Sequence, residues 1–211
     1  MKTGEQHTVQ IDTGQVILEG MLEIPENAPG VVIFPHGSGS GRFSPRNQFV
    51  AEVLRERGIG TLLLDLLDDR EANDRSKVFD INLLTQRVIS STDWIESNED
   101  TEELSVGYFG ASTGAAVALQ AAARRPEVKA VVSRGGRPDL AMAHLSDVTS
   151  PTLLIVGGND VPVIALNQQA YDALGCTKEM VIVPRATHLF EEPGTLEEVA
   201  RLAADWFKKY L

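Results

Sequence analysis

The sequence predicts an α/β fold, in which helices cover both faces of a mostly parallel β-sheet. Short, nearly continuous apolar runs alternate with longer segments of helical periodicity along most of the 211 residues. Strands that are apolar on both sides are typical of a parallel sheet buried between two layers of helices. At this length we expect one domain, spanning residues 1–211, rather than two.

The apolar runs mark the expected strands. The first two, Thr8–Ile11 and Val16–Ile24, read as an antiparallel pair joined around Gly14. The others are short and apolar throughout, as buried strands are: Val31–Phe34, Thr61–Leu64, Leu104–Phe109, Ala130–Val132, Thr152–Val156 and Met180–Val183.

The expected helices lie between these strands. They are Asn47–Arg57, Ile81–Glu96, Thr113–Arg125, Leu140–Leu145, Ala165–Leu174 and Leu196–Tyr210. Helix-breaking residues end three of them, namely Gly58, Pro126 and Gly175. Because ligands of open parallel sheets bind at the carboxyl ends of the strands, the residues that follow each strand are the candidates for a site.

Charge and cysteine content narrow the expected partners and location. The formal net charge of −11 argues against nucleic acid and membrane as partners, because both attract basic surfaces, and favours a solubilising surface instead. The single cysteine, Cys176, rules out an internal disulfide and fits a reducing compartment. No apolar run approaches the roughly 20 residues of a membrane span, and Met1 to Gln10 is polar, so we expect a cytoplasmic protein.

A Gly-x-Ser-x-Gly pattern joins the strand Leu104–Phe109 to the helix that follows it. Residues 110–114 read Gly-Ala-Ser-Thr-Gly, with Ser112 at the centre. A sharp strand-to-helix turn exposes such a serine hydroxyl as a nucleophile, and the glycines permit the crowded backbone. The N–H of Thr113, at the start of the helix, would face a developing oxyanion. The alternative is a serine that caps the helix between two turn glycines.

A glycine-rich loop follows the strand Val31–Phe34. Residues 36–41 read His-Gly-Ser-Gly-Ser-Gly, and the backbone N–H of Ser38 is the expected second oxyanion donor. The loop does not match a dinucleotide-binding pattern, because Arg42 stands where the third glycine is required, and no P-loop pattern is present. We interpret His36 as a buried or rim residue that fixes the loop rather than as a catalytic base.

Two aspartates are candidates for the acid of a catalytic triad. Asp160 follows the strand Thr152–Val156 and could accept the Nδ1–H of a histidine, although it could equally cap the helix after Pro162. Asp139, after the strand Ala130–Val132, reads more like the N-cap of its own short helix. We therefore favour Asp160.

His188 lies in the loop after the last strand, from which a histidine can reach a serine at a neighbouring strand end. A lone histidine in a loop is more commonly a solvent-exposed residue. However, Ser112, Asp160 and His188 follow three different strands in the order Ser, Asp, His, which is the order of the triad in enzymes with the Gly-x-Ser-x-Gly turn. The sequence therefore predicts Ser112 as nucleophile, His188 as general base and Asp160 as the acid that orients it.

Four arginines follow strands or the glycine-rich loop and could lie near the mouth of such a site. They are Arg42, Arg46, Arg134 and Arg137. A guanidinium there, with Arg42, Arg134 and Arg137 as the main candidates, could bind a substrate carboxylate or phosphate. The preferred alternative is that these arginines pair with the chain's own carboxylates. Asp65 also follows a strand, and we interpret it as a capping or loop residue.

The sequence resembles the dienelactone-hydrolase-like branch of the α/β-hydrolases over nearly the whole chain. The segments that carry the resemblance are His36–Gly41, Gly110–Gly114, Gly157–Asp160 and Ala186–Phe190. The resemblance implies the α/β-hydrolase fold, with a sheet of about eight mostly parallel strands, and ester hydrolysis through an acyl-enzyme. Dienelactone hydrolases carry a cysteine nucleophile where this sequence has Ser112, so general carboxylesterase activity is the expectation.

Many members of the wider fold carry a lid between the sixth and seventh strands. Here residues 133–151 leave room for one short helix, so we expect no lid domain and an open site for small or soluble esters. The same triad could serve a thioesterase, a lactonase or another acyl-transfer enzyme, and a non-catalytic binding protein could retain the scaffold. No cofactor or metal is implied, since the four histidines lack metal-ligand spacing, and the sequence leaves the oligomeric state open.

Overall fold

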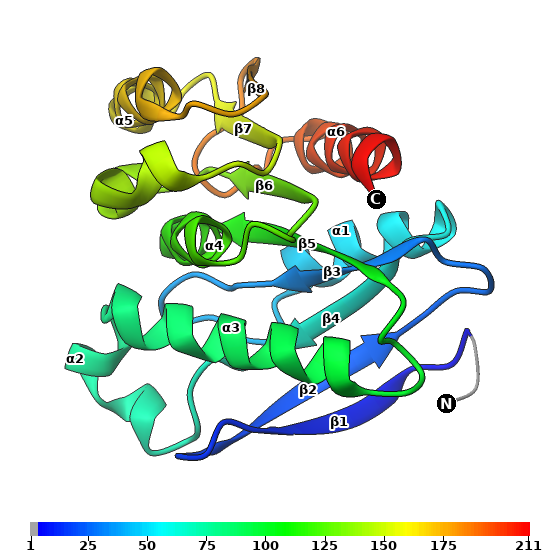
Figure 1. Cartoon of the computed structure of the whole chain (residues 1–211). Coiled ribbons are helices and arrows are strands. Elements are labelled where there is room, and N and C mark those ends of the chain that lie inside the picture. Colours follow the sequence, from blue (N-terminus) through cyan, green and yellow to red (C-terminus); the bar gives the residue numbers. More distant parts are fainter. Residues whose placement is uncertain (1–3) are drawn as a thin grey trace.

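A computed structural model describes residues 4–211 and has an eight-stranded sheet at its centre (Figure 1). The strands are β1 (His7–Asp12), β2 (Ile17–Glu23), β3 (Gly30–Phe34), β4 (Gly60–Leu64), β5 (Ser105–Ala111), β6 (Ala130–Arg134), β7 (Thr152–Gly157) and β8 (Lys178–Val183). Their order is β1-β2-β4-β3-β5-β6-β7-β8. Only β1 with β2 and β2 with β4 pair antiparallel, which confirms the mostly parallel sheet and the opening antiparallel pair.

Helices cover both faces of this sheet, as Figure 1 shows. One face carries α1 (Pro45–Glu56) and α6 (Thr195–Tyr210), whose apolar sides pack on Phe34, Phe109 and Val132. The other carries α3 (Ile81–Ser97), α4 (Thr113–Arg124) and α5 (Val161–Ala173), with their own apolar core. The near-continuous apolar strands are thus buried on both sides, which is the physical reason for their composition.

Two details of the helices differ from the expectation, and a third agrees with it. The segment between β4 and α3 holds two single turns, η1 (Glu71–Asn73) and α2 (Arg75–Val78), which are too short to show helical periodicity. The helix α5 begins at Val161 instead of Ala165, because Pro162 is well suited to a first helical turn. Between β6 and β7 lies only η2 (Pro138–Asp147), a 3₁₀-helix, so the expected absence of a lid domain there agrees with the structure.

The topology brings one end of the central strands together. The strands β3, β5, β6, β7 and β8 are adjacent or nearly adjacent and run parallel, so their carboxyl ends lie along one edge of the sheet. The residues that follow these strands therefore meet at that edge, although they lie far apart in the sequence. Within residues 4–211, none of the helices has the length and apolar character needed to cross a lipid bilayer.

Candidate active site

Ser112 occupies a sharp, strained turn between β5 and α4. Its backbone has φ of 52° and ψ of −124°, a conformation that costs energy in a residue with a Cβ. The turn forces backbone segments together on both sides of the serine. A Cβ at Gly110 would lie 2.5 Å from Ala115 Cα, and a Cβ at Gly114 would lie 2.7 Å from His36 O and closer still to Pro35 O. Both glycines of the pattern are therefore required by close packing.

We expect Gly114→Ala to destabilise the protein by about 3 kcal/mol or more, because the new methyl group meets backbone carbonyls that cannot move aside. The matched control is Gly175→Ala, since a Cβ at that position has no neighbour within 4 Å. Urea unfolding of the two variants measures the difference. Equal stability in both would show that the turn tolerates a side chain and would contradict the packing described above.

The structure brings Ser112, His188 and Asp160 into one hydrogen-bonded line. His188 Nδ1 lies 2.7 Å from Asp160 Oδ2, and His188 Nε2 lies 3.4 Å from Ser112 Oγ. The carboxylate side chain is 13% exposed, so water weakens this interaction little. The first distance fits an Nδ1–H that donates to the carboxylate and leaves the Nε2 lone pair facing the serine. The second is slightly long for a hydrogen bond, as is common in sites without substrate.

The two candidate acids differ in what their side chains contact. Asp160 precedes the first residue of α5 but makes no side-chain capping bond, because its carboxylate is turned to His188. Asp139 accepts two hydrogen bonds from Arg137, at 2.9 and 2.8 Å. The expectation that Asp139 caps its helix is wrong, because η2 begins at Pro138 and places Asp139 within its first turn.

The loop that carries one expected oxyanion donor, Ser38, contacts the residue that carries the other, Thr113. Thr113 is the first residue of α4, so its N–H has no partner within the helix. The N–H of Ser38 donates to Thr113 Oγ1 at 3.0 Å. Gly37 packs closely against the serine, since a Cβ at position 37 would lie 3.1 Å from Ser112 Cβ. An incoming oxyanion would thus have to share or replace the Thr113 hydroxyl on the Ser38 N–H.

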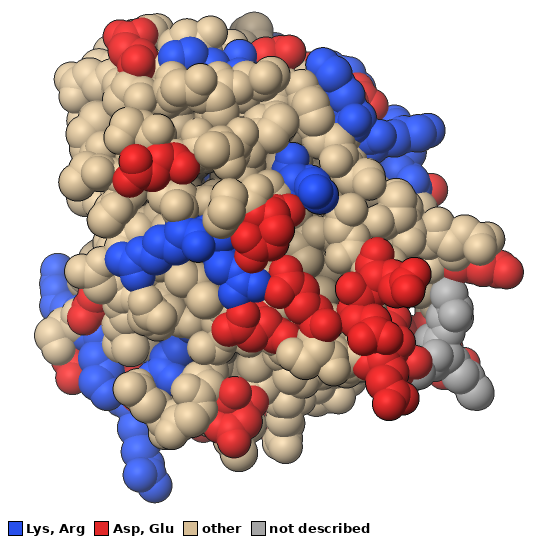
Figure 2. Space-filling view, in the orientation of Figure 1, with Lys and Arg blue, Asp and Glu red and all other residues tan. Residues whose placement is uncertain are grey.

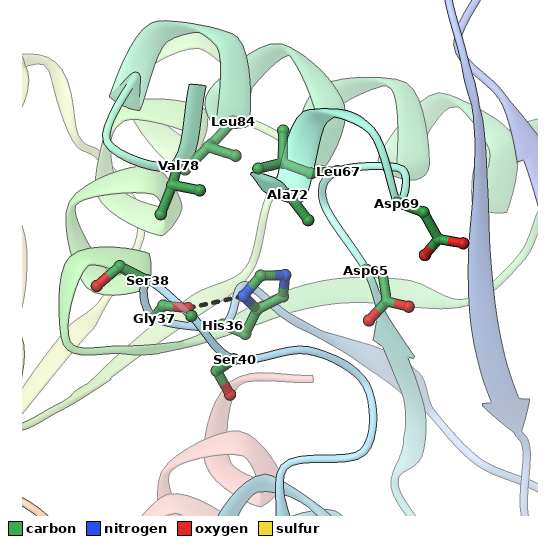
Figure 3. A pocket seen from close by; sticks show the side chains of 11 residues that line it. His36, Gly37, Ser38, Ser40, Asp65, Leu67, Asp69, Ala72, Val78 and Leu84 are labelled. Carbon is green, nitrogen blue, oxygen red and sulfur yellow. Dashed lines mark hydrogen bonds between the residues drawn. The ribbon is translucent and has the colours of Figure 1, made fainter. Parts of the chain in front are cut away.

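A cavity of about 320 Å³ adjoins this loop (Figure 3). Residues 36–40 of the glycine-rich loop form one side of it. Four apolar side chains from the segment between β4 and α3 and from the start of α3 form the opposite side: Leu67, Ala72, Val78 and Leu84. Asp65 and Asp69 lie at one end. The sequence pointed to Asp65, which follows a strand, but not to the apolar side chains that line this cavity.

The match to a protein-family model covers almost the entire chain. The model of the dienelactone hydrolase family matches residues 18–211. The chain belongs to the dienelactone hydrolase family. Membership places it among hydrolases that share the α/β-hydrolase fold, which the sheet order and the strand-to-helix turn at Ser112 show directly.

Relatives of this dienelactone hydrolase family member include solved structures and a curated protein. The crystal structure of a dienelactone hydrolase from Anabaena variabilis is 55% identical, with a TM-score of 0.97 over 100% of both chains. Est1E from Butyrivibrio proteoclasticus shares the fold at 16% identity, with a TM-score of 0.78 over 96% of this chain and 98% of its own. A Mycobacterium tuberculosis protein provisionally named a phosphoribosyl transferase is 56% identical over 204 residues. That match covers 96% of this chain, which spans only 46% of the curated protein's length.

The arginines of this family member do not face the cavity as free cations. Arg42 forms ion pairs with Asp65 and Glu19, and Arg137 is bound to Asp139, which raises its pKa. Such pairing is the alternative that the sequence favoured, and acidic and basic side chains also lie side by side on the face shown in Figure 2.

Arg134 is buried, and it lies against α1 instead of a carboxylate. Its Nη2 is 3.4 Å from Asn47 Oδ1, and it does not line the cavity beside the glycine-rich loop. Burial lowers the pKa of Arg134 to about 10, and the nearby positive charge of Arg46 adds to this effect. Arg46 itself lies 3.7 Å from Glu191. None of these four arginines lines the cavity beside the glycine-rich loop, and the binding of a substrate anion by Arg42, Arg134 or Arg137 stays a prediction.

His36 fixes the glycine-rich loop, as the sequence indicated. Its Nδ1–H donates to Gly37 O at 2.8 Å, while its Nε2 accepts the N–H of Leu66 at 3.1 Å. Both ring nitrogens therefore form a hydrogen bond when the ring is neutral. Burial lowers the pKa of His36 below its usual 6.5, and the Gly37 bond and the Asp65 charge oppose this only in part.

The lowered pKa of His36 makes the stability of the protein depend on pH. The unfolded chain binds a proton at this histidine more readily than the folded chain, so protonation favours unfolding. We expect the free energy of unfolding to fall as the pH drops below 6.5 and to level off once the pH is below the pKa of the folded state. Urea unfolding at several pH values measures this slope. His36→Gln cannot titrate and should lose it, and an unchanged slope in that variant would contradict the assignment.

Proposed function

We propose that this chain is a serine hydrolase that cleaves carboxylic esters of small or soluble substrates through an acyl-enzyme. The observation that carries the proposal is the line from Asp160 through His188 to a serine on a strained strand-to-helix turn. A structural serine needs neither the strain nor a histidine aimed at its hydroxyl. Membership of a hydrolase family supports the same reading.

The first half of the reaction transfers the acyl group to the enzyme. Ser112 Oγ attacks the ester carbonyl carbon while its proton passes to His188 Nε2. Asp160 keeps the Nδ1–H in place and stabilises the imidazolium that forms. The bond between the carbonyl carbon and the alcohol oxygen then breaks, and the alcohol leaves with the proton from His188.

The second half returns the enzyme to its starting state. Water attacks the acyl-enzyme as His188 takes a proton from it, and the serine oxygen leaves with that proton as the carboxylic acid is released. In both halves the carbonyl oxygen becomes an oxyanion, which the N–H groups of Thr113 and Ser38 would stabilise. One such donor contributes roughly 3–4 kcal/mol to the transition state.

A fluorophosphonate probe tests the proposal, because it reacts with activated serine hydroxyls. We expect labelling of Ser112, identified by peptide mass spectrometry, together with turnover of soluble p-nitrophenyl esters. Absence of both would leave the scaffold as a non-catalytic binding protein. Faster turnover of thioesters or lactones than of open-chain esters would keep the triad chemistry but reassign the physiological bond.

The names of two relatives suggest one further substrate to test and one alternative reaction. The Anabaena protein is called a dienelactone hydrolase, and its 55% identity makes a lactone a worthwhile member of the substrate panel. The name phosphoribosyl transferase belongs to a protein of which this chain spans less than half, so the remainder of that protein could account for the name. We therefore propose hydrolysis, and not phosphoribosyl transfer, for this chain.

A further inference from the structure

We infer that the guanidinium groups of Arg134 and Arg46, together with the first turn of α1, bind a phosphate group of the substrate beside Ser112. The inference rests on the proposed function and names its substrate class, esters that carry a phosphate monoester. It comes from a buried positive charge next to the nucleophile that meets no negative partner among residues 4–211.

Arg134 is a buried cation without a carboxylate. The residue is only 6% exposed, and its one hydrogen bond runs from Nη2 to a neutral acceptor, Asn47 Oδ1, at 3.4 Å. Its Nε is fully buried and has no hydrogen-bond partner in the described part of the chain. Buried charges in proteins are normally paired, and a guanidinium keeps its proton at neutral pH. The missing negative charge must therefore come from a ligand.

Arg46 brings a second positive charge to the same place. It is the second residue of α1, and its charge adds to burial in lowering the pKa of Arg134. Its Nε is also buried without a hydrogen-bond partner among the residues that the structure describes. Its Nη1 lies 3.7 Å from the carboxylate of Glu191, which is 67% exposed and therefore well screened by water. An anion between the two guanidinium groups would replace their repulsion by attraction.

The first turn of α1 adds a third attraction for an anion. The helix has 12 residues and begins at Pro45. The guanidinium of Arg134 is directed at this turn, since its Nη2 contacts the third helical residue, Asn47. The backbone N–H of Arg46 has no acceptor within the helix, and the helix dipole is positive at this end. A helix N-terminus of this kind is well suited to bind phosphate.

The charge of these groups favours a phosphate over a carboxylate. Two guanidinium groups and a helix N-terminus carry about +2.5 charges, of which the exposed Glu191 offsets at most one. A carboxylate supplies a single negative charge, whereas a phosphate monoester carries about −1.5 to −2 at pH 7 and has three acceptor oxygens. Those oxygens match three sets of donors, namely the side chains of Arg134 and Arg46 and the free N–H groups of the helix.

The backbone places Arg134 beside the nucleophile. The N–H of Ser112 donates to Arg134 O at 3.2 Å, and Arg134 pairs with Ala111 in the register of β5 and β6. Arg137 is also adjacent, because its N–H donates to Ser112 O at 3.0 Å, but its side chain is already neutralised by Asp139. An ester whose carbonyl carbon lies at Ser112 can therefore extend a phosphate toward Arg134.

Phosphate-bearing esters test the inference on both sides of the ester bond. On the alcohol side, 2-acetoxyethyl phosphate is compared with its uncharged dimethyl phosphotriester. On the acyl side, ethyl 3-phosphonopropanoate is compared with its uncharged dimethyl phosphonate. For each pair, the ratio of kcat/KM for the charged ester to that for the uncharged ester is measured in each variant. Dividing the ratio of a variant by that of the wild type cancels the intrinsic reactivity of each ester.

We expect Arg46→Gln and Arg134→Met each to lower this ratio by about 10-fold or more for at least one pair, as loss of a charge-assisted hydrogen bond does. Arg134→Lys keeps the charge and should retain more of the ratio than Arg134→Met. The matched control is Arg57→Gln, beyond the opposite end of α1, where Arg57 is bound to Asp205; it should keep the wild-type ratio.

The kinetic result can overturn the inference even if one variant is unstable. Arg46 is one-third exposed, so Arg46→Gln should fold and decides the question alone if Arg134→Met does not. A ratio in Arg46→Gln equal to that of the wild type for both pairs would overturn the inference.

A measurement without chemistry separates this inference from the proposed function. Inorganic phosphate, titrated at constant ionic strength, should raise the Tm of the wild type and of Ser112→Ala along a saturating curve, by about 3 °C or more at ten times its Kd. It should not do so in Arg46→Gln. If this pattern holds while no ester is hydrolysed, the proposed function fails and the phosphate site stands. If phosphate acts alike in the wild type and in Arg46→Gln, or if acetate acts as strongly as phosphate in the wild type, the phosphate site is overturned whatever the esterase activity.

Discussion

Ser112→Ala is expected to lower kcat for ester hydrolysis by about 10⁴- to 10⁶-fold, since it removes the attacking oxygen while leaving the oxyanion donors in place. The variant should fold normally, because alanine adds no atom to the crowded turn and has a Cβ as serine does. Steady-state hydrolysis of p-nitrophenyl acetate measures the loss, and urea unfolding checks the fold.

The control for this variant is Ser105→Ala, at the opposite end of β5. It makes the same chemical change at the end of β5 that lies away from the turn of Ser112, so it should retain wild-type turnover. Activity in Ser112→Ala within tenfold of the wild type, with the fold intact, would show that the nucleophile lies elsewhere.

Asp160→Asn carries the second largest expected effect, a loss of up to about 10⁴-fold in kcat. The carboxylate now accepts the Nδ1–H of His188 at 2.7 Å. An amide can instead present its own N–H to Nδ1, which favours the tautomer with a proton on Nε2 and removes the base that faces Ser112. The KM should change little, because the Asp160 side chain does not line the cavity beside the glycine-rich loop.

Asp139→Asn is the matched control for Asp160→Asn. Asp139 was the rival acid, and its carboxylate is held by Arg137 and not by a histidine. It should therefore retain most of the activity. A reversal of the two results, with Asp139→Asn inactive and Asp160→Asn active, would reassign the acid.

Much of this arrangement could be predicted because it follows from patterns local to each strand end. Apolar runs gave the strands, and the carboxyl ends of parallel strands must share one edge, so Ser112, Asp160 and His188 could be expected to meet. Their order along the chain distinguished a triad from three unrelated polar residues. The same reasoning found the loop around Ser38 and the role of His36 in fixing it.

The cavity and the pairing of charges could not be predicted in the same way. The wall formed by Leu67, Ala72 and Val78 lies in a segment of single turns without periodicity. Whether Arg42 meets a substrate or Asp65 depends on side-chain directions in three dimensions, which residue type and spacing do not fix. Likewise, the bond from the Ser38 N–H to Thr113 Oγ1 joins residues 75 positions apart.

The reacting side chains and the cavity beside the glycine-rich loop come from different parts of the chain. Ser112, Asp160 and His188 lie on turns after β5, β7 and β8, whereas the residues that line the cavity fall within positions 36–84. The two parts meet at Ser38, whose N–H is a proposed oxyanion donor and which also lines the cavity. Substitution of the apolar side chains at positions 67 and 78 should therefore change which esters are accepted more than it changes the proton transfers at Ser112.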